Sequence, residues 1–228
     1  MKMKVFLLLF CFVFIGGLTG CEIMTRQFKK YDCRASAVPD PQTSEDFVLA
    51  SRYHFDFGEY ECAFTAAQEA VRRKKDNPEA YNARALAHYG YQEYSAALSD
   101  FQISVWLDPQ NPKTYYGRSG VYEKLDDPEN ALKDLDTVIV LAQEDGYRSQ
   151  FPVWIHRRGV LRMNKGDAAG ALDDFSQAIR FDPDNPFYYY ERAYLYRQIG
   201  NTTAAEQDER RNATLETARE QKKSATKK

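Results

Sequence analysis

Residues 78–111 read PEAYNARALAHYGYQEYSAALSDFQISVWLDPQN, and residues 112–145 repeat the same pattern of large, small and charged positions. An alanine marks the pattern at positions 63, 97, 131, 171 and 205; three of the four steps between these alanines are 34 residues long, and one is 40. Self-similarity at a fixed period of this length is typical of a solenoid, in which each unit buries its apolar face by stacking on its neighbours. The sequence therefore predicts a stacked array of repeats.

The alanines define five windows, which are 44–77, 78–111, 112–145, 152–185 and 186–219, with six additional residues, 146–151, before the fourth. Each window predicts two helices. In the first half, a large residue at position 4 and a small one at position 8 share a helix face. These pairs are Phe47 and Ser51, Tyr81 and Ala85, Tyr115 and Ser119, Ile155 and Gly159, and Tyr189 and Ala193. In the second half, Ala97, Phe101 and Ser104 follow the i, i+4, i+7 spacing of a buried stripe.

This pattern resembles the tetratricopeptide repeat family in its position-4 aromatic residue, position-8 small residue, position-20 alanine and terminal proline. The resemblance implies an all-α superhelix of helix-turn-helix repeats over residues 44–219. Window five departs from the pattern with Glu209 at an apolar position, and its second half is almost wholly polar. We expect this half to cap the open end of the solenoid. Residues 220–228 are expected to form a basic, disordered tail.

Arginine at position 7 accompanies aspartate at position 23 in windows two to five. The pairs are Arg84 and Asp100, Arg118 and Asp134, Arg158 and Asp174, and Arg192 and Asp208. Window one has Ala50 and Ala66 instead. We infer an ion pair within each repeat, because pairing between windows would leave one charge orphaned at each end of the array. A bidentate pair would fix the register of the two helices. The alternative is that these charges lie on the surface and never touch.

The first twenty residues form a separate feature. Lys2 and Lys4 precede an apolar run from Val5 to Ile15, and the stretch ends with Leu-Thr-Gly-Cys at residues 18–21. The run is too short to span a membrane comfortably and has the charged, apolar and small-residue order of a secretory signal. Its end resembles the lipobox of bacterial lipoproteins, which implies cleavage before Cys21 and acylation of that cysteine, for example with palmitate. The alternative is an ordinary secretory signal with a chance cysteine.

The lipobox resemblance implies a signal peptide at residues 1–20 and a lipidated tether at residues 21–43. The mature protein would then be held in the bilayer of the bacterial envelope by acylated Cys21. Aspartate after the lipidated cysteine is the usual inner-membrane retention signal in enteric bacteria, so Glu22 favours the periplasmic face of the outer membrane. Cys33 and Cys62 would remain in an oxidising compartment. They either form a disulfide that joins the tether to window one or remain two separate thiols.

Composition and motifs give little support to catalysis. The chain is 43% hydrophobic, enough for a core, and its formal net charge of −2 gives no indication of nucleic-acid binding. It contains no HExxH, GxSxG, CxxC or glycine-rich phosphate loop. We therefore predict no catalytic residue, cofactor or resident metal. The alternative is an envelope enzyme, or a receptor for a small ligand or metal, that uses the region of His54 and His88.

The family resemblance indicates a binding surface. In tetratricopeptide repeats the first helices line a concave face, into which positions 2, 5, 9 and 12 point. The resemblance therefore implies a partner-binding groove formed by Phe55, Tyr89, Tyr116, His156, Met163, Phe187, Tyr190, Tyr194 and Arg197. Its apolar and aromatic character predicts binding of a peptide or a helix. We expect a non-enzymatic scaffold or assembly adaptor for envelope proteins, of the kind that acts in pilus assembly or cell-wall remodelling.

Overall fold

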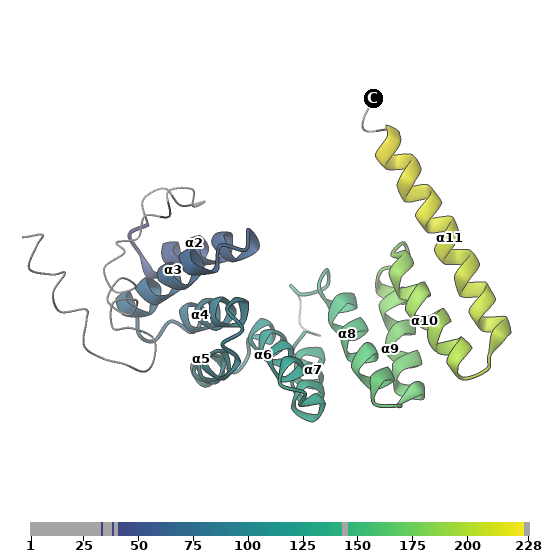
Figure 1. The fold of residues 1–228 in the computed structure, drawn as a ribbon, viewed down its shortest axis with the longest axis horizontal. Coiled ribbons are helices and arrows are strands. Elements are labelled where there is room, and N and C mark those ends of the chain that lie inside the picture. The colour runs from purple at the N-terminus through teal and green to yellow at the C-terminus, as the bar shows by residue number, and fades with distance from the viewer. Residues whose placement is uncertain (1–32, 34–37, 39–40, 143–145, 226–228) are drawn as a thin grey trace, which may run out of the picture.

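The computed structural model describes residues 33, 38, 41–142 and 146–225, and this part of the chain forms ten α-helices and no strand (Figure 1). The helices are α2 (Ser44–Asp56), α3 (Tyr60–Arg73), α4 (Pro78–Gly90), α5 (Tyr94–Leu107), α6 (Pro112–Lys124), α7 (Pro128–Leu141), α8 (Phe151–Asn164), α9 (Ala168–Phe181), α10 (Pro186–Gln198) and α11 (Thr202–Ala225). The predicted all-α fold, a solenoid of helix-turn-helix repeats, is confirmed.

Consecutive helices pack in pairs, and each pair stacks on the next to form an arched row (Figure 1). We call the pairs repeats one to five, from α2 and α3 to α10 and α11. In Figure 1, α5 lies below α4 and α7 below α6, on the outer side of the arch. Repeats one and five lie at opposite ends. The first and last repeats therefore each have one face that no other repeat covers.

Local sequence explains where the helices begin. Helices α4, α6 and α10 each start at a proline, which costs no hydrogen bond at the first helical position. The side chains of the preceding residues Asn77, Asn111 and Asn185 accept a hydrogen bond from the backbone N–H of the residue that follows the proline. The turn between the paired helices uses the left-handed region, at Gly58 in repeat one and at Gln92 in repeat two, where φ is 74° and 63°. A glycine adopts this conformation without the steric cost that glutamine bears.

The marker alanines form the centre of the core. All five are fully buried, and the large residues four positions later, Phe101, Leu135 and Phe175, are also completely buried. Glycine is required at two places where a first helix meets these side chains, Gly117 against Phe101 and Gly159 against Phe175. A Cβ atom at Gly159 would lie 2.8 Å from the Phe175 ring, closer than carbon atoms approach without displacement. The alternation of large and small residues in the sequence is thus the packing contact between the paired helices.

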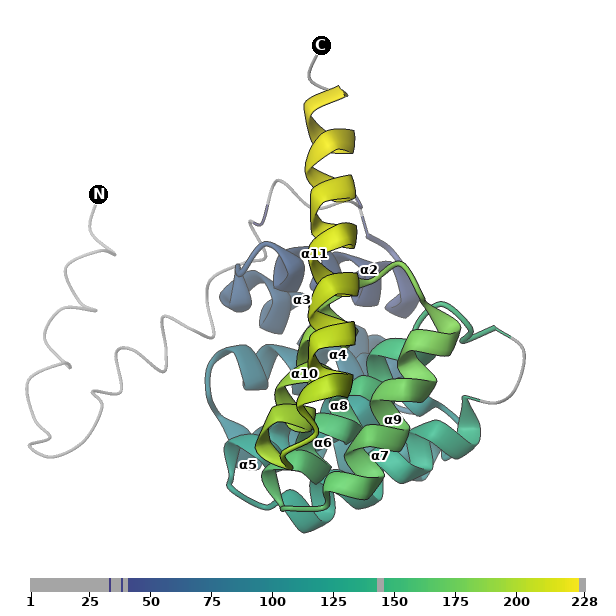
Figure 2. The ribbon, with the colours of Figure 1, turned by 90° about the vertical axis from the view of Figure 1, so that its right-hand side faces the viewer.

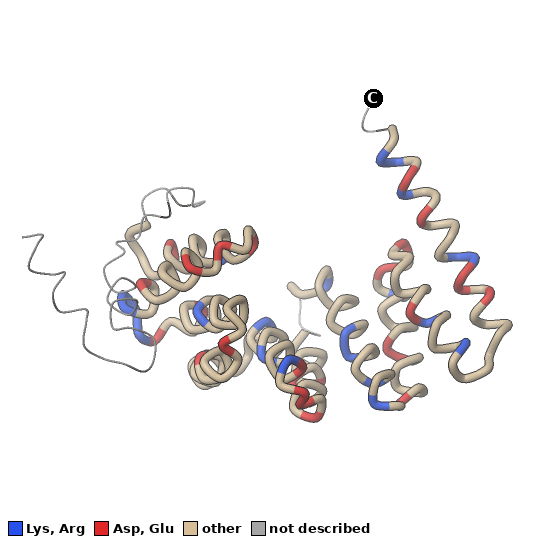
Figure 3. The backbone as a smooth tube through the Cα atoms, viewed as in Figure 1, with Lys and Arg blue, Asp and Glu red and all other residues tan. Residues whose placement is uncertain are grey.

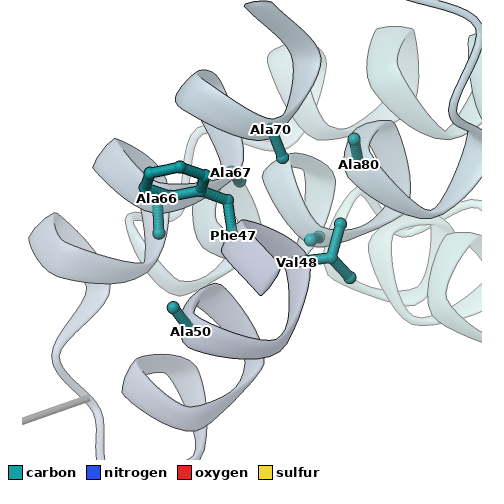
Figure 4. Close-up of a cluster of buried hydrophobic side chains, with 8 residues drawn as sticks. Phe47, Val48, Ala50, Ala66, Ala67, Ala70 and Ala80 are labelled. Carbon is teal, nitrogen blue, oxygen red and sulfur yellow. The ribbon is translucent and has the colours of Figure 1, made fainter. Parts of the chain in front are cut away.

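Repeat one packs on its neighbour through a small-residue cluster (Figure 4). Phe47 and Val48 of α2 contact alanines of α3, together with Ala80 of α4. The alanines leave room for the helices to approach closely, and each buried methyl group contributes transfer free energy of about 0.8 kcal/mol. Ala50 and Ala66, which stand where the other repeats have arginine and aspartate, are completely buried. Apolar contact therefore replaces the ion pair in this repeat.

Helix α11 corrects one prediction. It continues to Ala225, so residues 220–225 are helical where the sequence predicted a disordered tail. This stretch contains neither glycine nor proline and is rich in residues with high helix propensity. Only Ala205, Asp208 and Leu215 are buried along α11, which fits a polar cap. Its last turns project beyond the body of the solenoid (Figure 2), and acidic and basic residues are interspersed along it (Figure 3).

The N-terminal predictions fall largely outside the described residues. The signal peptide at residues 1–20, the lipidation site Cys21 and most of the tether at residues 21–43 all lie there. Lipid anchoring consequently stays a prediction. Among the described residues, no helix combines the length and the apolar character that crossing a bilayer requires.

Candidate partner-binding surface

Four arginine-aspartate pairs fix the two helices of repeats two to five against each other. In every pair, Nε and Nη2 of the arginine donate to the two carboxylate oxygens, at distances of 2.6 to 3.0 Å. The pairs are Arg84 with Asp100, Arg118 with Asp134, Arg158 with Asp174 and Arg192 with Asp208. All four aspartates are buried. The charges thus touch within each repeat, and their bidentate geometry sets the helix register.

Three of these arginines also contact the preceding repeat. Nη1 of Arg118 donates to Gln102 at 3.0 Å, and Nη1 of Arg158 donates to Asp136 at 2.9 Å. Nη1 of Arg192 donates to Ser176 at 2.9 Å. These three acceptors share window position 25. This second contact was not predicted from the sequence, although an oxygen-bearing side chain at position 25 of windows two to four indicates it. Arg118, Arg158 and Arg192 therefore each constrain the orientation of one repeat on the next as well as their own helix pair.

The predicted groove residues divide into two groups by exposure. Phe187, Tyr190 and Tyr194 of α10 are 49%, 56% and 49% exposed, and Arg197 is exposed as well. The three aromatic residues are three and four positions apart, so they share one face of α10. We call them the α10 aromatic strip. The rings of its first two members stack with centroids 6.4 Å apart.

The other five predicted residues are half-buried against neighbouring side chains. Phe55 packs on Tyr60, and Tyr89 packs on Tyr94, each within its own repeat. Tyr116 lies 5.8 Å from the Trp154 ring and under the Arg157 guanidinium. Met163 packs against the core cluster that contains Phe175. The structure thus brings part of the predicted groove together in repeats four and five, whereas Phe55 and Tyr89 lie in the other half of the arch (Figure 1).

The ring of His156 packs among aromatic side chains beside the α10 aromatic strip. Its ring centroid lies 5.2 Å from those of Phe187 and Tyr188 and 5.6 Å from that of Phe175. Its Nε2 atom is buried and has no hydrogen-bond partner among the described residues. This burial lowers the pKa of His156 from 6.5 to about 4. The imidazole is therefore neutral at pH 7, and it presents an uncharged ring to the strip.

Charged side chains on the first helices of the repeats, α2, α4, α6 and α8, form ion pairs between repeats, but the acidic side chain at the equivalent place on α10 does not. Arg52 pairs with Glu79 between repeats one and two, and Arg157 donates to Glu123 at 2.7 Å between repeats four and three. Glu191 occupies the same window position as Arg157 and inverts its charge. Glu191 has no ion-pair partner among the described residues, and burial raises its pKa. An acidic side chain that forms no ion pair with the described residues thus lies on the helix that carries the aromatic strip.

Arg197, the last predicted groove residue, is used inside the molecule. Its Nε and Nη2 atoms donate to the two carboxylate oxygens of Glu209 on α11, at 2.7 Å each. Glu209 had been identified as a departure from the apolar pattern of the repeat. The structure gives a reason for this departure, because the glutamate anchors the capping helix to α10 through an exposed ion pair.

His54 and His88 occupy equivalent places in repeats one and two. His54 Nδ1 lies 2.6 Å from Glu59 Oε2, and His88 Nδ1 lies 2.7 Å from Glu93 Oε2. Each histidine therefore pairs with a carboxylate of its own repeat. Cys33 and Cys62, for which the sequence left two alternatives, are joined in a disulfide with their Cα atoms 5.8 Å apart.

Comparison with known proteins places the fold. A repeat model described as "TPR repeat" matches residues 159–200, and one described as "Tetratricopeptide repeat" matches residues 48–112. A sequence search of curated proteins finds no match. Several solved structures are similar. MamA from Desulfovibrio magneticus is 18% identical, with a TM-score of 0.66 and coverage of 78% of this chain and 97% of the other.

Two further solved structures share the fold. PilF of Pseudomonas aeruginosa is 17% identical, with a TM-score of 0.69 and coverage of 75% of this chain and 76% of the other. YrrB, described as a TPR protein with an unusual peptide-binding site, is 18% identical, with a TM-score of 0.60 and coverage of 81% and 92%. At such identities the likeness establishes architecture alone. Together with the two repeat matches, it identifies tetratricopeptide repeats in both halves of this chain, arranged as the solenoid that these repeats form.

Proposed function

We propose that the protein is a non-enzymatic adaptor that binds another polypeptide through α8 and α10, the first helices of repeats four and five. The observation that carries this proposal is the α10 aromatic strip, in which three large rings are each about half exposed on one helix face. Single exposed apolar residues are ordinary on protein surfaces, but a continuous stripe indicates an interaction site. Tyrosine is also enriched among residues that dominate binding energy.

The surroundings of the strip define the partner chemistry. Val153 of α8 is 46% exposed, and the neutral ring of His156 lies against Phe187. An apolar face of a helix, or alternate apolar side chains of an extended peptide, complements such a surface. Glu191 adds a carboxyl group that forms no ion pair with another described residue. We therefore propose an amphipathic segment that carries a basic side chain next to its apolar anchors.

We further propose that the adaptor acts in the bacterial envelope, held by acylated Cys21 at the periplasmic face of the outer membrane, and that its partners are envelope proteins. The support is the order of charged, apolar and small residues in the first twenty positions and the Leu-Thr-Gly-Cys end of that stretch. Several acyl chains, at about 0.8 kcal/mol per buried methylene, give an effectively permanent anchor. Pilus assembly and cell-wall remodelling are the candidate processes.

Affinity capture followed by reconstitution tests the binding surface. The full-length chain is recovered from membranes after cross-linking, in parallel with the Tyr190→Ala, Tyr194→Ala variant. Trp106→Ala is the matched control, because Trp106 is 79% exposed on α5, a second helix outside the strip. The captured partner is then purified, and its affinity is measured for all three forms. Loss of two interface tyrosines at about 1 to 2 kcal/mol each predicts binding at least thirtyfold weaker for the tyrosine variant and unchanged for the tryptophan variant.

Charge reversal provides the complementary test of partner chemistry. Glu191→Lys is expected to weaken the complex, and reversal of the basic residue in the partner is expected to restore it. Equal recovery of partners by wild type and by the tyrosine variant would show that the surface is wrongly assigned, although the fold would stand.

A further inference from the structure

A cluster of metal-binding residue types lies in repeat one, at the end of the array opposite to the aromatic strip. Cys33 precedes α2, His54 lies in the last turn of α2, and Cys62 lies in the first turn of α3. One ligand atom from each of the three lies within 4.8 Å of the other two. His54 is 1% exposed, and the cysteines are half-buried. Three soft or borderline donors from separate segments therefore converge on one small volume.

The histidine of this cluster has a carboxylate behind it. Glu59 Oε2 lies 2.6 Å from His54 Nδ1. A carboxylate that accepts the N–H of an imidazole fixes the ring orientation and makes the other nitrogen more basic, as in the outer shell of zinc sites. His88 and Glu93 form the same pair in repeat two, but Ala96 stands at the window position of Cys62. Repeat two consequently provides the same histidine-carboxylate pair without sulfur.

We propose that Cys33, Cys62 and His54 form a zinc site in the reduced protein, with water or an external ligand in the fourth position. Two thiolates and one imidazole are a known donor set for four-coordinate Zn²⁺. Thiolate ligands also disfavour Mg²⁺, Ca²⁺ and Mn²⁺, which prefer oxygen. Zn–S bonds of about 2.3 Å in a tetrahedral site separate the two sulfurs by about 3.8 Å, so the sulfurs, which are bonded to each other in this structure, would move apart after reduction to bind the metal.

The zinc form and the disulfide form exclude each other. A dithiol reductant transfers two electrons and two protons to the Cys33–Cys62 bond, which gives two thiols and the oxidised cyclic disulfide of the reductant. Zn²⁺ then displaces both thiol protons, forms two Zn–S bonds and releases two protons. In either form the segment before α2 is fastened to α3. The link between Cys33 and α3 is therefore kept under both oxidising and reducing conditions.

The test uses the full-length chain with Cys11→Ser and Cys21→Ser, which leaves Cys33 and Cys62 as its cysteines. The protein is reduced with dithiothreitol, freed of reductant without oxygen, and titrated with Co²⁺ and then Zn²⁺. We expect one equivalent of metal, with the absorption bands of tetrahedral, thiolate-ligated Co²⁺ and displacement by Zn²⁺. Bound zinc should protect both thiols from alkylation. The oxidised protein should take up no metal at this site.

Matched variants distinguish ligation from adventitious thiol binding. His54→Gln removes the third ligand, and Glu59→Gln is expected to lower zinc affinity tenfold to a hundredfold. The controls His88→Gln and Glu93→Gln change the equivalent pair in repeat two and should leave zinc affinity unchanged. Circular dichroism before metal addition reports folding; if His54→Gln unfolds, Glu59→Gln decides, because the Glu59 side chain is half exposed. Absence of uptake by the reduced chain, or equal affinity of wild type and the deciding variant, would overturn the proposal.

Discussion

Replacing His156 with phenylalanine should remove the contribution of this imidazole to the pH dependence of stability between pH 4 and pH 6.5. Phenylalanine matches the aromatic surroundings of the ring, which are formed by Phe175, Phe187 and Tyr188. It also removes Nε2, a buried nitrogen without a hydrogen-bond partner among the described residues. The variant therefore changes a titrating group while it preserves the packing of repeats four and five.

The direction in which stability changes with pH follows from the pKa of the imidazole in the folded and unfolded states. Burial lowers the pKa of His156 from 6.5 to about 4, so the folded protein keeps the ring neutral where the unfolded chain already binds a proton. Proton uptake by the unfolded state lowers the free energy of unfolding as the pH falls through this window. Each pH unit of the window is worth about 1.4 kcal/mol, which gives about 2 kcal/mol between pH 7.5 and pH 5 and about 3 kcal/mol in total. Above about pH 6.5 the imidazole is neutral in both states, so it no longer lowers the free energy of unfolding.

Denaturant melts at pH 7.5, 6 and 5 measure this effect as a difference between wild type and His156→Phe. The carboxylates titrate in both proteins, so their contribution cancels in the difference. His88→Gln serves as a control, because it removes a histidine that lies outside the aromatic surroundings of His156. NMR titration of the His156 ring gives the pKa directly. The reasoning is refuted if wild type and His156→Phe lose the same stability on acidification, or if the ring titrates near 6.5.

Three further predictions concern the stability of the solenoid and the lipid anchor. Asp174→Ala removes the buried carboxylate that Arg158 and Arg162 share, leaves Arg158 only its contact with the exposed Asp136, and should lower stability by about 3 to 5 kcal/mol. Asp173→Ala on the exposed side should change stability by less than about 0.5 kcal/mol, as measured by thermal denaturation. Gln92→Gly relieves a left-handed backbone conformation and should stabilise the protein by about 0.5 kcal/mol after the entropy cost of glycine, with Gly166→Ala losing about 1 kcal/mol in the same assay. Cys21→Ala should abolish incorporation of a palmitate analogue in bacteria and release the chain from membranes; retention of the label would contradict the proposed lipidation site.

Local pattern was sufficient to predict the repeat and its internal contacts. The alanine period and the alternation of large and small residues arise from packing between paired helices, which is set by residues close in sequence. Arg158 and Asp174 are only sixteen positions apart, and their joint absence from window one was visible as covariation inside a single chain. Such regularities are predictable because the same physical contact recurs.

The exposure of the groove was less predictable, because it depends on contacts between unlike repeats. Tyr116 occupies the position of Tyr190, but Trp154 and Arg157 of the following repeat pack against it. Tyr190 belongs to the last repeat and is followed only by the capping helix α11, so its ring stays exposed. Equivalent positions in a solenoid therefore differ in function when the neighbour differs. Window positions alone do not carry this information.

The two ends of the solenoid thus have different chemistry, and the repeats between them, joined by arginine contacts, set the distance between the two ends. The tether is joined to repeat one through the Cys33–Cys62 disulfide, whereas the α10 aromatic strip lies in repeat five. The intervening arginines each bind their own repeat, and those from repeat three onward also bind the one before. In the proposed arrangement, a partner bound to the strip is held at a set distance and orientation from an anchor at Cys21. The hydrogen bonds from Arg118, Arg158 and Arg192 to the preceding repeat would then resist rotation of one repeat against the next.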